Sequence, residues 1–457
     1  MSNKRVRSLR FLMFLGLLFT SSTVPGQTQK IGETQSPVPR HAADRTSPID
    51  LSEAKTRFGE AKQLARVDHG QLWGKSLEGP MLFVDPRTRF VVGNQADAED
   101  VLKPAAGVFI GKLPPRVPIA NTACQWAGVH WSMVLWPLPG DETSRSILLM
   151  HESWHRIQAD LGLPSIDPAN AHLDTMPGRY WLQLEWRALA RALTAPAAER
   201  RAALADALLF RQHRRGLFKA SDKEENQLEL HEGLAEYTGV KLCPLPPAQK
   251  RRFVAGRIET LPQEVDSFVR SFAYLSGPAY GLLLDETLPG WPGKLKSGDD
   301  LGQLLAETMN LKPVTLPEAA LKERARRYDG DKLWTREASR EEARLKRLAA
   351  FRQILVDGPV LVLPLAKHRM SFNPSQLVPL EGKGTIYPTL TLSDRWGKLE
   401  VRKAALIATD YTKVVVAAPT KVEATALSGD GWELRLEAGW KPVKGGRAGD
   451  WKIVEEK

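Results

Sequence analysis

Two histidines one helical turn apart are the residues of this sequence best suited to chemistry. Residues 147–157 read ILLMHESWHRI, so His151 and His155 frame a His-Glu-x-x-His pattern. On a helix, positions i and i+4 share a face, which lets both imidazoles bind one metal ion. Glu152 can then act as general base for a metal-bound water. The apolar flanks predict a buried helix, so we interpret the pattern as a zinc site rather than as surface side chains.

A zinc site needs a third protein ligand, and two glutamates compete for this role. Glu185 follows His155 by 30 positions, and Glu232 follows it by 77. Both lie on predicted helices, and both have an alanine three positions later that would let the helix approach the histidines closely. The distance along the chain does not decide between them.

The elements around the histidines predict a small sheet followed by a mainly helical half. Alternating apolar residues and turn signals predict the strands 81–84, 90–92, 107–110 and 126–136. Helical periodicity begins at 48–66 and continues after the sheet. The later expected helices are 141–161, which carries the histidines and is capped within 141–143, and 179–193, 197–215, 224–237, 264–284, 296–307 and 317–350. We expect a break or kink in helix 264–284 at Pro278.

The sequence pattern changes again near residue 356, where predicted short strands alternate with turn signals to the C-terminus. This pattern predicts a small all-β domain, and it contains no catalytic constellation. The expected fold class is therefore α+β, with one domain at 48–355 and a β-rich domain at 356–457.

The N-terminus predicts a secretory signal peptide at 1–26 and a disordered leader at 27–47. Four basic residues precede an apolar stretch, 11–19, that is too short to span a bilayer. We therefore expect a secreted or periplasmic protein with no membrane span after cleavage. Removing residues 1–26 takes four positive side chains from the net charge of +11 and leaves +7. These charges are scattered, which argues against a nucleic-acid partner.

The chain has only two cysteines, Cys124 and Cys243. In an oxidising compartment they can form a disulfide across the histidine segment, or they can remain two buried thiols. The sequence leaves both possibilities open. Two cysteines without a C-x-x-C pair exclude a cysteine-rich zinc module.

The pattern resembles the gluzincin metallopeptidases, in particular the aminopeptidase N-like and peptidase MA-like group. In that family the third zinc ligand is the glutamate of an N-E-G-x-A-x-Y segment, and residues 231–237 here read HEGLAEY. The resemblance therefore implies a zincin-like catalytic domain with Glu232 as the third ligand. The family also has a tyrosine in a Y-x-x-G pattern that stabilises the oxyanion. Tyr274 and Gly277 fit this pattern here, with Tyr280 as an alternative.

The chain also departs from that family. The gap between His155 and Glu232 is longer than in the aminopeptidases, and the G-A-M-E-N motif that holds a substrate amine is absent. The resemblance thus does not extend to aminopeptidase specificity. It places the family's edge strand at 128–135. Glu236 can orient a ligand histidine or be a solvated helix residue. We interpret His231 as a packing or supporting residue, and we assign no role to His172.

These observations lead to the hypothesis of a secreted zinc metallopeptidase that hydrolyses peptide or protein substrates. Its metal ligands are His151, His155 and Glu232, its general base is Glu152, and Tyr274 supports the oxyanion. Two alternatives remain: a catalytically silent gluzincin-like scaffold that binds a peptide or partner, and a zinc hydrolase for another bond. The intact pair of histidines and their glutamate argue against the silent scaffold.

Overall fold

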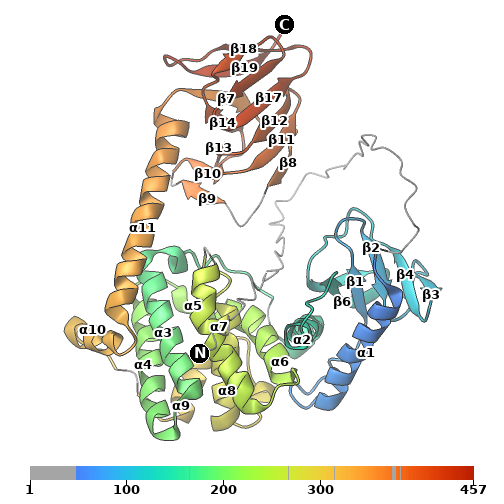
Figure 1. Ribbon diagram of the computed structural model, residues 1–457, viewed down its shortest axis with the longest axis vertical. Coiled ribbons are helices and arrows are strands. Elements are labelled where there is room, and N and C mark those ends of the chain that lie inside the picture. Colours follow the sequence, from blue (N-terminus) through green and yellow to red (C-terminus); the bar gives the residue numbers. More distant parts are fainter. Residues whose placement is uncertain are drawn as a thin grey trace, which may run out of the picture. The chain divides into compact units, whose positions relative to one another are not determined.

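The structure is a computed structural model that describes residues 48–163, 165–265, 267–312, 314–372, 377–380 and 382–456. It mixes helices and strands, as expected for an α+β chain. The expected signal peptide and leader lie outside the described residues. The chain divides into two compact units, one up to Trp334 and one from Thr335 onward (Figure 1). Helix α11 (Gly330–Arg352) crosses this boundary, which lies before the expected one because Leu348 and Phe351 pack with the second unit.

The first unit begins with helix α1 (Leu51–Asp68) and a six-stranded sheet in the order β3-β4-β2-β1-β6-β5. The strands are β1 (Met81–Val84), β2 (Phe90–Gly93), β3 (Lys103–Ala105), β4 (Val108–Lys112), β5 (Thr122–Trp126) and β6 (Val129–Leu135). Among the described strands of this sheet, β1 and β6 pair in parallel and the other neighbours pair antiparallel. Alternation along β1 sends Phe83 toward helix α1, where it stacks on Phe58 at 4.2 Å, and sends Leu82 into a second cluster with Met133.

The expected single strand 126–136 is in fact the end of one strand and most of another. Ala127 and Gly128 both have positive φ, 48° and 72°, which makes a two-residue turn between antiparallel β5 and β6. Such turns need left-handed residues, which favours the glycine. The strand next to the histidine helix, β6, is therefore internal, and β5 occupies the edge that the resemblance assigned to 128–135.

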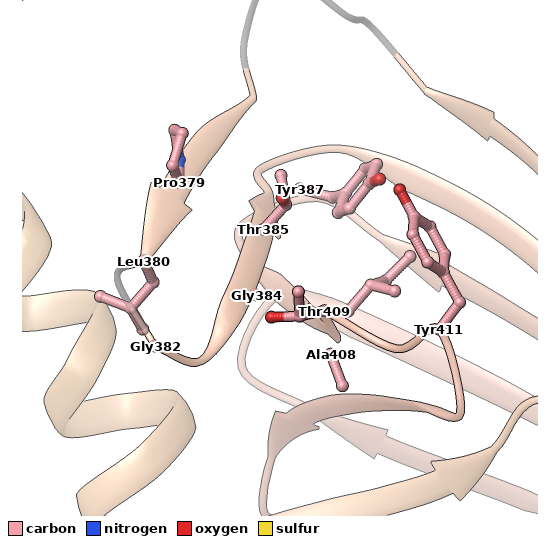
Figure 2. A pocket seen from close by; sticks show the side chains of 10 residues that line it. Pro379, Leu380, Gly382, Gly384, Thr385, Tyr387, Ala408, Thr409 and Tyr411 are labelled. Atoms are coloured by element: carbon pink, nitrogen blue, oxygen red, sulfur yellow. The ribbon is translucent and has the colours of Figure 1, made fainter. Parts of the chain in front are cut away.

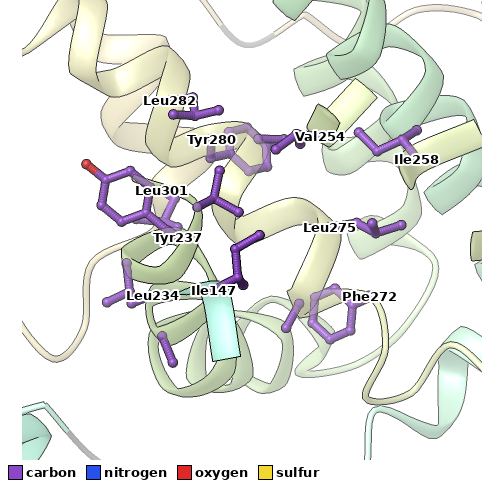
Figure 3. Close-up of a cluster of buried hydrophobic side chains, with 14 of the residues drawn as sticks. Ile147, Leu234, Tyr237, Val254, Ile258, Phe272, Leu275, Tyr280, Leu282 and Leu301 are labelled. Atoms are coloured by element: carbon purple, nitrogen blue, oxygen red, sulfur yellow. The ribbon is translucent and has the colours of Figure 1, made fainter. Parts of the chain in front are cut away.

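Helices fill the rest of the first unit. They are α2 (Glu142–Gln158), α3 (Met176–Thr194), α4 (Ala197–Gly216), α5 (Ser221–Leu228), α6 (Leu234–Leu242), α7 (Pro247–Glu264), α8 (Ala273–Thr287), α9 (Leu301–Thr308) and α10 (Glu318–Arg326). The buried core where α6, α7 and α8 meet contains Tyr237, Val254 and Leu275, together with Ile147 of α2 (Figure 3). This core fixes the helices that carry the candidate ligands.

Several helical expectations differ from the structure. The expected helix 224–237 contains a π turn, and the expected helix 317–350 is divided into α10 and α11. Helix α7 was missed, because its sequence carries few apolar residues. The expected helix 264–284 is instead interrupted between Glu264 and Ala273, and α8 then continues through Pro278 rather than breaking there. Packing of α8 among α3, α6 and α7 thus outweighs the local effect of the proline.

The second unit is a β-sandwich of a seven-stranded sheet (β18-β19-β7-β14-β13-β10-β9) and a six-stranded sheet (β15-β16-β17-β12-β11-β8). Its strands are β7 (Val360–Pro364), β8 (Arg369–Phe372), β9 (Val378–Leu380), β10 (Gly384–Tyr387), β11 (Leu390–Asp394), β12 (Gly397–Val401), β13 (Ala405–Ala408), β14 (Lys413–Ala417), β15 (Lys421–Val422), β16 (Ala426–Gly429), β17 (Trp432–Leu436), β18 (Trp440–Lys444) and β19 (Trp451–Glu455). Apolar side chains of both sheets form its core. A pocket of about 360 Å³ lies beside β9 and β10 (Figure 2), and the described residues that line it, which include Tyr387 and Tyr411, carry no charged side chain.

Two further expectations concern the membrane and the cysteines. Across the described ranges, every helix is too short or too polar to cross a bilayer. Cys124 and Cys243 are free thiols, so the disulfide is not formed in this structure. Cys124 is partly buried on β5, whereas Cys243 is buried after α6, where its thiol donates to the carbonyl of Val240.

Candidate metal centre

Helix α2 presents His151 and His155, here called the histidine pair, on one buried face. The helix begins after Asp141, whose side chain accepts a hydrogen bond from the amide of Ser144 at 2.8 Å. This is a standard N-cap, and it lies where the sequence predicted it. Apolar neighbours such as Trp154 are fully buried and fix the helix against the core. The two Nε2 atoms of the histidine pair lie 3.1 Å apart.

The carboxylate of Glu232 joins the histidine pair from a different helix. Its Oε2 atom lies 3.4 Å from Nε2 of His151 and 3.7 Å from Nε2 of His155. Ligand atoms that surround zinc tetrahedrally at 2.0–2.1 Å are separated by about 3.3–3.4 Å. The three observed separations bracket this value. His151, His155 and Glu232 are therefore buried and close enough to bind a metal ion.

A close approach of two helices brings Glu232 to this position. A Cβ atom at Gly239 of α6 would lie 2.5 Å from the carbonyl oxygen of Ile147 on α2. Only glycine lets the two backbones come this close, so α6 and the turn before it lie directly against the histidine helix. Sequence reasoning identified Glu232 through its motif but not this contact.

Hydrogen bonds on the far side of each imidazole orient the histidine pair. Nδ1 of His151 lies 3.0 Å from Oε2 of Glu236, and Nδ1 of His155 lies 3.1 Å from Oε1 of Gln158. Both partners accept, so each Nδ1 carries a proton, which leaves Nε2 as the ring atom of each histidine that would bind a metal ion. Glu236 is held in turn by an ion pair with Arg257. Of the two readings of Glu236, the structure thus favours histidine orientation.

The electrostatics of the centre favour a cation. Burial by itself would lower the pKa of His151, but its contacts with Glu232 and Glu236 outweigh burial and raise that pKa to about 10. Burial would likewise raise the pKa of Glu232, yet hydrogen bonds from the histidine pair hold it well below its ordinary value. The site therefore stabilises positive charge between its nitrogen and oxygen atoms, as a metal site does.

Glu152 lies on the same helix turn as the histidine pair and is 3 % exposed. Burial raises the pKa of its carboxyl group to about 7, although the charges of the histidine pair oppose that shift. Its Oε2 atom has no hydrogen-bond partner among the described residues. A buried carboxylate with a free oxygen and a pKa near neutrality is suited to accept and return a proton.

Tyr274 of α8 completes the centre. Its hydroxyl donates to Oε2 of Glu232 at 2.6 Å, and its ring stacks on His151 with the ring centres 5.6 Å apart. Burial and the charge of Glu232 keep the pKa of the phenol well above its ordinary value, so the phenol remains a proton donor. The other tyrosine considered, Tyr280, lies elsewhere and donates to Glu185 at 2.8 Å.

The competing ligand, Glu185, belongs to a separate buried ionic cluster. Its carboxylate accepts hydrogen bonds from Arg211 and Arg214 as well as from Tyr280. His172 lies in the same cluster, where its Nε2 atom is 2.8 Å from Oε1 of Glu225. The structure therefore groups Glu232, not Glu185, with the histidine pair.

A second acidic group adjoins the centre. Asp167 and His231 lie close enough to Glu232 to form another possible ligand set. The guanidinium of Arg270 already occupies this place, with an ion pair to Asp167 and a 3.2 Å contact to Oε1 of Glu232. His231 also donates to Gln158 through Nδ1 at 3.1 Å, consistent with the supporting role that the sequence indicated. One cation beside the histidine pair, rather than two, fits this arrangement.

Sequence reasoning missed Gln158, Arg257 and Arg270. Gln158 had a detectable signal, because it stands three positions after His155 on the same face of α2. The two arginines had no detectable sequence signal, because they come from α7 and from the segment before α8, which are far from the histidine pair in the sequence. Comparison of the chain with family models, with curated proteins and with solved structures finds no match.

Proposed function

We propose that the protein is a zinc-dependent metallopeptidase of the gluzincin type with a zincin-like catalytic domain. The observation that carries this proposal is the buried triangle of His151, His155 and Glu232 with Glu152 on the adjoining helix position. Nitrogen and carboxylate donors in this number suit zinc with an open position. Bound zinc would supply a Lewis acid that polarises a carbonyl group and acidifies a water molecule.

Residues of the chain would carry out the proton transfer, support the oxyanion and orient the histidine pair. Glu152 takes a proton from the attacking water at its unpartnered Oε2 atom and passes it to the leaving amine. The phenol of Tyr274 donates a hydrogen bond to the carbonyl oxygen as negative charge develops on it. Glu236 and Gln158 keep the lone pairs of the histidine pair directed at the ion. In this proposal the protein acts on peptide or protein substrates outside the cytoplasm.

The burial of the centre supports a second candidate, a metal-binding scaffold without turnover. The most exposed of the four motif residues, His155, is only 9 % exposed. The site therefore presents little open surface to a substrate in this structure. A third candidate, hydrolysis of an ester or another bond, uses the same activation of water.

One experiment separates these candidates. Zinc content and turnover of mixed peptides and of a nitrophenyl ester are measured for the wild type and for Glu152→Gln, with Glu259→Gln as the control at an exposed helix position. We expect Glu152→Gln to retain zinc and lose peptide hydrolysis, while Glu259→Gln retains both. Turnover that survives in Glu152→Gln, or a wild type without zinc, would overturn the mechanism. Zinc without turnover of either substrate supports the scaffold, and turnover of the ester alone supports the third candidate.

A further inference from the structure

A single turn of π-helix, Glu229–Gly233, joins α5 to α6 and carries Glu232. Its defining hydrogen bond runs from the amide of Leu234 to the carbonyl of Glu229, five positions earlier. Such turns are rare, occur mostly inside α-helices and are frequent at functional sites. The sequence predicts one helix, 224–237, across this region.

The positions of four glutamates show what this turn changes. They follow one another at spacings of four, three and four: Glu225, Glu229, Glu232 and Glu236. In a continuous α-helix these spacings would place all four carboxylates on one face. In the structure the first two face the arginines of α4, and the last two face the histidine pair. A π turn adds one residue to the helix, which rotates everything after it by about 100°.

The arginines of α4 hold the first part of this segment. Arg211 donates to both carboxylate oxygens of Glu229, the residue at which the π turn begins. Arg214 donates to both oxygens of Glu225 at 2.9 and 2.7 Å. The side chains of Arg211 and Glu229 are 4 % and 1 % exposed, so neither can exchange its partner for water. The contact between Arg211 and Glu229 therefore fixes the orientation of Glu229, and the π turn rotates the part of the helix that follows this residue.

We propose that Arg211 is a positioning residue that holds the π turn through Glu229 and so directs Glu232 at the histidine pair. The inference rests on the metal centre of the proposed function. Without this contact the segment can relax to a continuous α-helix, and Glu232 then turns toward the arginines. Arg211 touches neither the metal position nor the substrate, so its effect passes entirely through the conformation of the turn.

The energetics of buried ion pairs agree with this role. Replacing such a pair by apolar side chains of similar volume is often neutral or stabilising, so stability alone does not account for it. The other acids that Arg211 contacts keep partners of their own when it is removed. Glu185 retains Arg214, and Asp300 retains Arg215. A double substitution of Arg211 and Glu229 can therefore preserve the fold and change only the turn.

The test uses the full chain with Arg211→Met and Glu229→Met combined. The control removes another ion pair of α4, between buried Asp206 and Arg324 of α10, which is 38 % exposed, with Arg324→Met and Asp206→Asn combined. We expect the double variant to melt near the wild-type temperature and to bind zinc at least tenfold more weakly, in keeping with the usual effect of removing support behind a ligand. The control should bind zinc as the wild type does. A folded double variant with wild-type zinc affinity would overturn the inference.

Two further measurements keep the outcome decisive. If the double variant does not fold, Arg211→Lys retains the charge but loses the forked contact, and an unchanged zinc affinity in that variant overturns the inference. A crystal structure of the double variant shows whether the π turn persists, even when neither the wild type nor the double variant binds zinc. Zinc absent from the wild type refutes the proposed function, whereas a π turn that persists with Glu232 still at the histidine pair refutes the role of Arg211.

Discussion

The hydroxyl of Tyr274 donates to Oε2 of Glu232 at 2.6 Å, and this is the carboxylate oxygen that faces the histidine pair. The phenol and a metal ion therefore compete for one oxygen atom. In the proposed function, metal binding at Oε2 would weaken its hydrogen bond with the phenol, and the phenol would become available to a developing oxyanion. Tyr274 would then both respond to metal loading and take part in catalysis.

Tyr274→Phe is expected to keep zinc and to lower kcat by about 10²–10³, the usual effect of removing one oxyanion donor. The substitution removes the hydroxyl group without disturbing the three ligand atoms, so the zinc content should equal that of the wild type. Steady-state peptide hydrolysis and metal analysis measure both effects. Tyr280→Phe is the matched control, because its hydroxyl contacts Glu185 instead. Equal losses of kcat in both variants would contradict a specific role for Tyr274.

Glu232→Gln should lose zinc, whereas Glu185→Gln should keep zinc and lose stability. The first removes a ligand charge at the histidine pair and should abolish stoichiometric zinc binding. The second should retain zinc but lower the free energy of unfolding by about 3 kcal/mol, because it breaks a buried ion pair with Arg214. Metal analysis and chemical denaturation of both variants measure this contrast. Loss of zinc in Glu185→Gln alone would reverse the ligand assignment.

The sequence predicted the local part of this centre and could not predict the rest. His151, Glu152 and His155 are recognisable because their spacing and their apolar flanks specify one face of one helix. Glu232 was identified only through its resemblance to a family motif. The structure places it at the histidine pair, but through a π turn that no local pattern indicates, because the glutamate spacing itself favours a continuous α-helix.

The supporting residues depend on contacts between distant segments. Arg257 reaches Glu236 from α7, a helix that the apolar periodicity did not reveal. The hairpin at Ala127 and Gly128 was hidden within one long apolar run, so that strand β6 was mistaken for the edge of the sheet. The contact of Arg257 thus depends on packing between segments far apart in the sequence, whereas the hairpin depends on two left-handed residues that the apolar pattern conceals.

Acid should destabilise the protein through Glu225. Burial would raise the pKa of this carboxyl group, but Arg214 and Arg215 hold it well below its ordinary value of 4.5. Because the folded-state pKa is the lower one, the stabilisation is fully present above about pH 5 and is lost as the pH falls below 4.5 toward the folded-state value. Glu225→Gln should therefore lower stability at pH 7 and make its dependence on pH below 4.5 shallower, by up to about 1.4 kcal/mol per pH unit.

Chemical denaturation between pH 3 and pH 7 measures this slope for the wild type and for Glu225→Gln. Glu199→Gln is the control, because Glu199 forms an exposed ion pair with Arg191, and such pairs contribute less than about 1 kcal/mol. Its slope should match that of the wild type. Parallel loss of stability in the wild type and in Glu225→Gln would show that other carboxylates govern the acid response.

Gly277→Ala should damage catalysis more than metal binding. A Cβ atom at Gly277 would lie 2.3 Å from Cα of Gly233, inside the π turn, so α8 and the π turn must move apart to accept it. Overpacking of this kind costs about 1–3 kcal/mol. Tyr274 stands one turn earlier on α8 and moves with it, and Glu232 adjoins Gly233, while His151 and His155 on α2 lie away from this contact. Denaturation, zinc affinity and kcat measured on one preparation resolve the three effects.

The control for this change is Gly256→Ala on α7, where an added Cβ atom would meet no atom within 4 Å. Alanine favours a helix over glycine by up to about 1 kcal/mol, so this variant should be as stable as the wild type or more stable. The contrast isolates the contact between Gly277 and Gly233 from the general effect of placing alanine in a helix. If Gly277→Ala were as stable and as active as Gly256→Ala, the contact between α8 and the π turn would not position Tyr274.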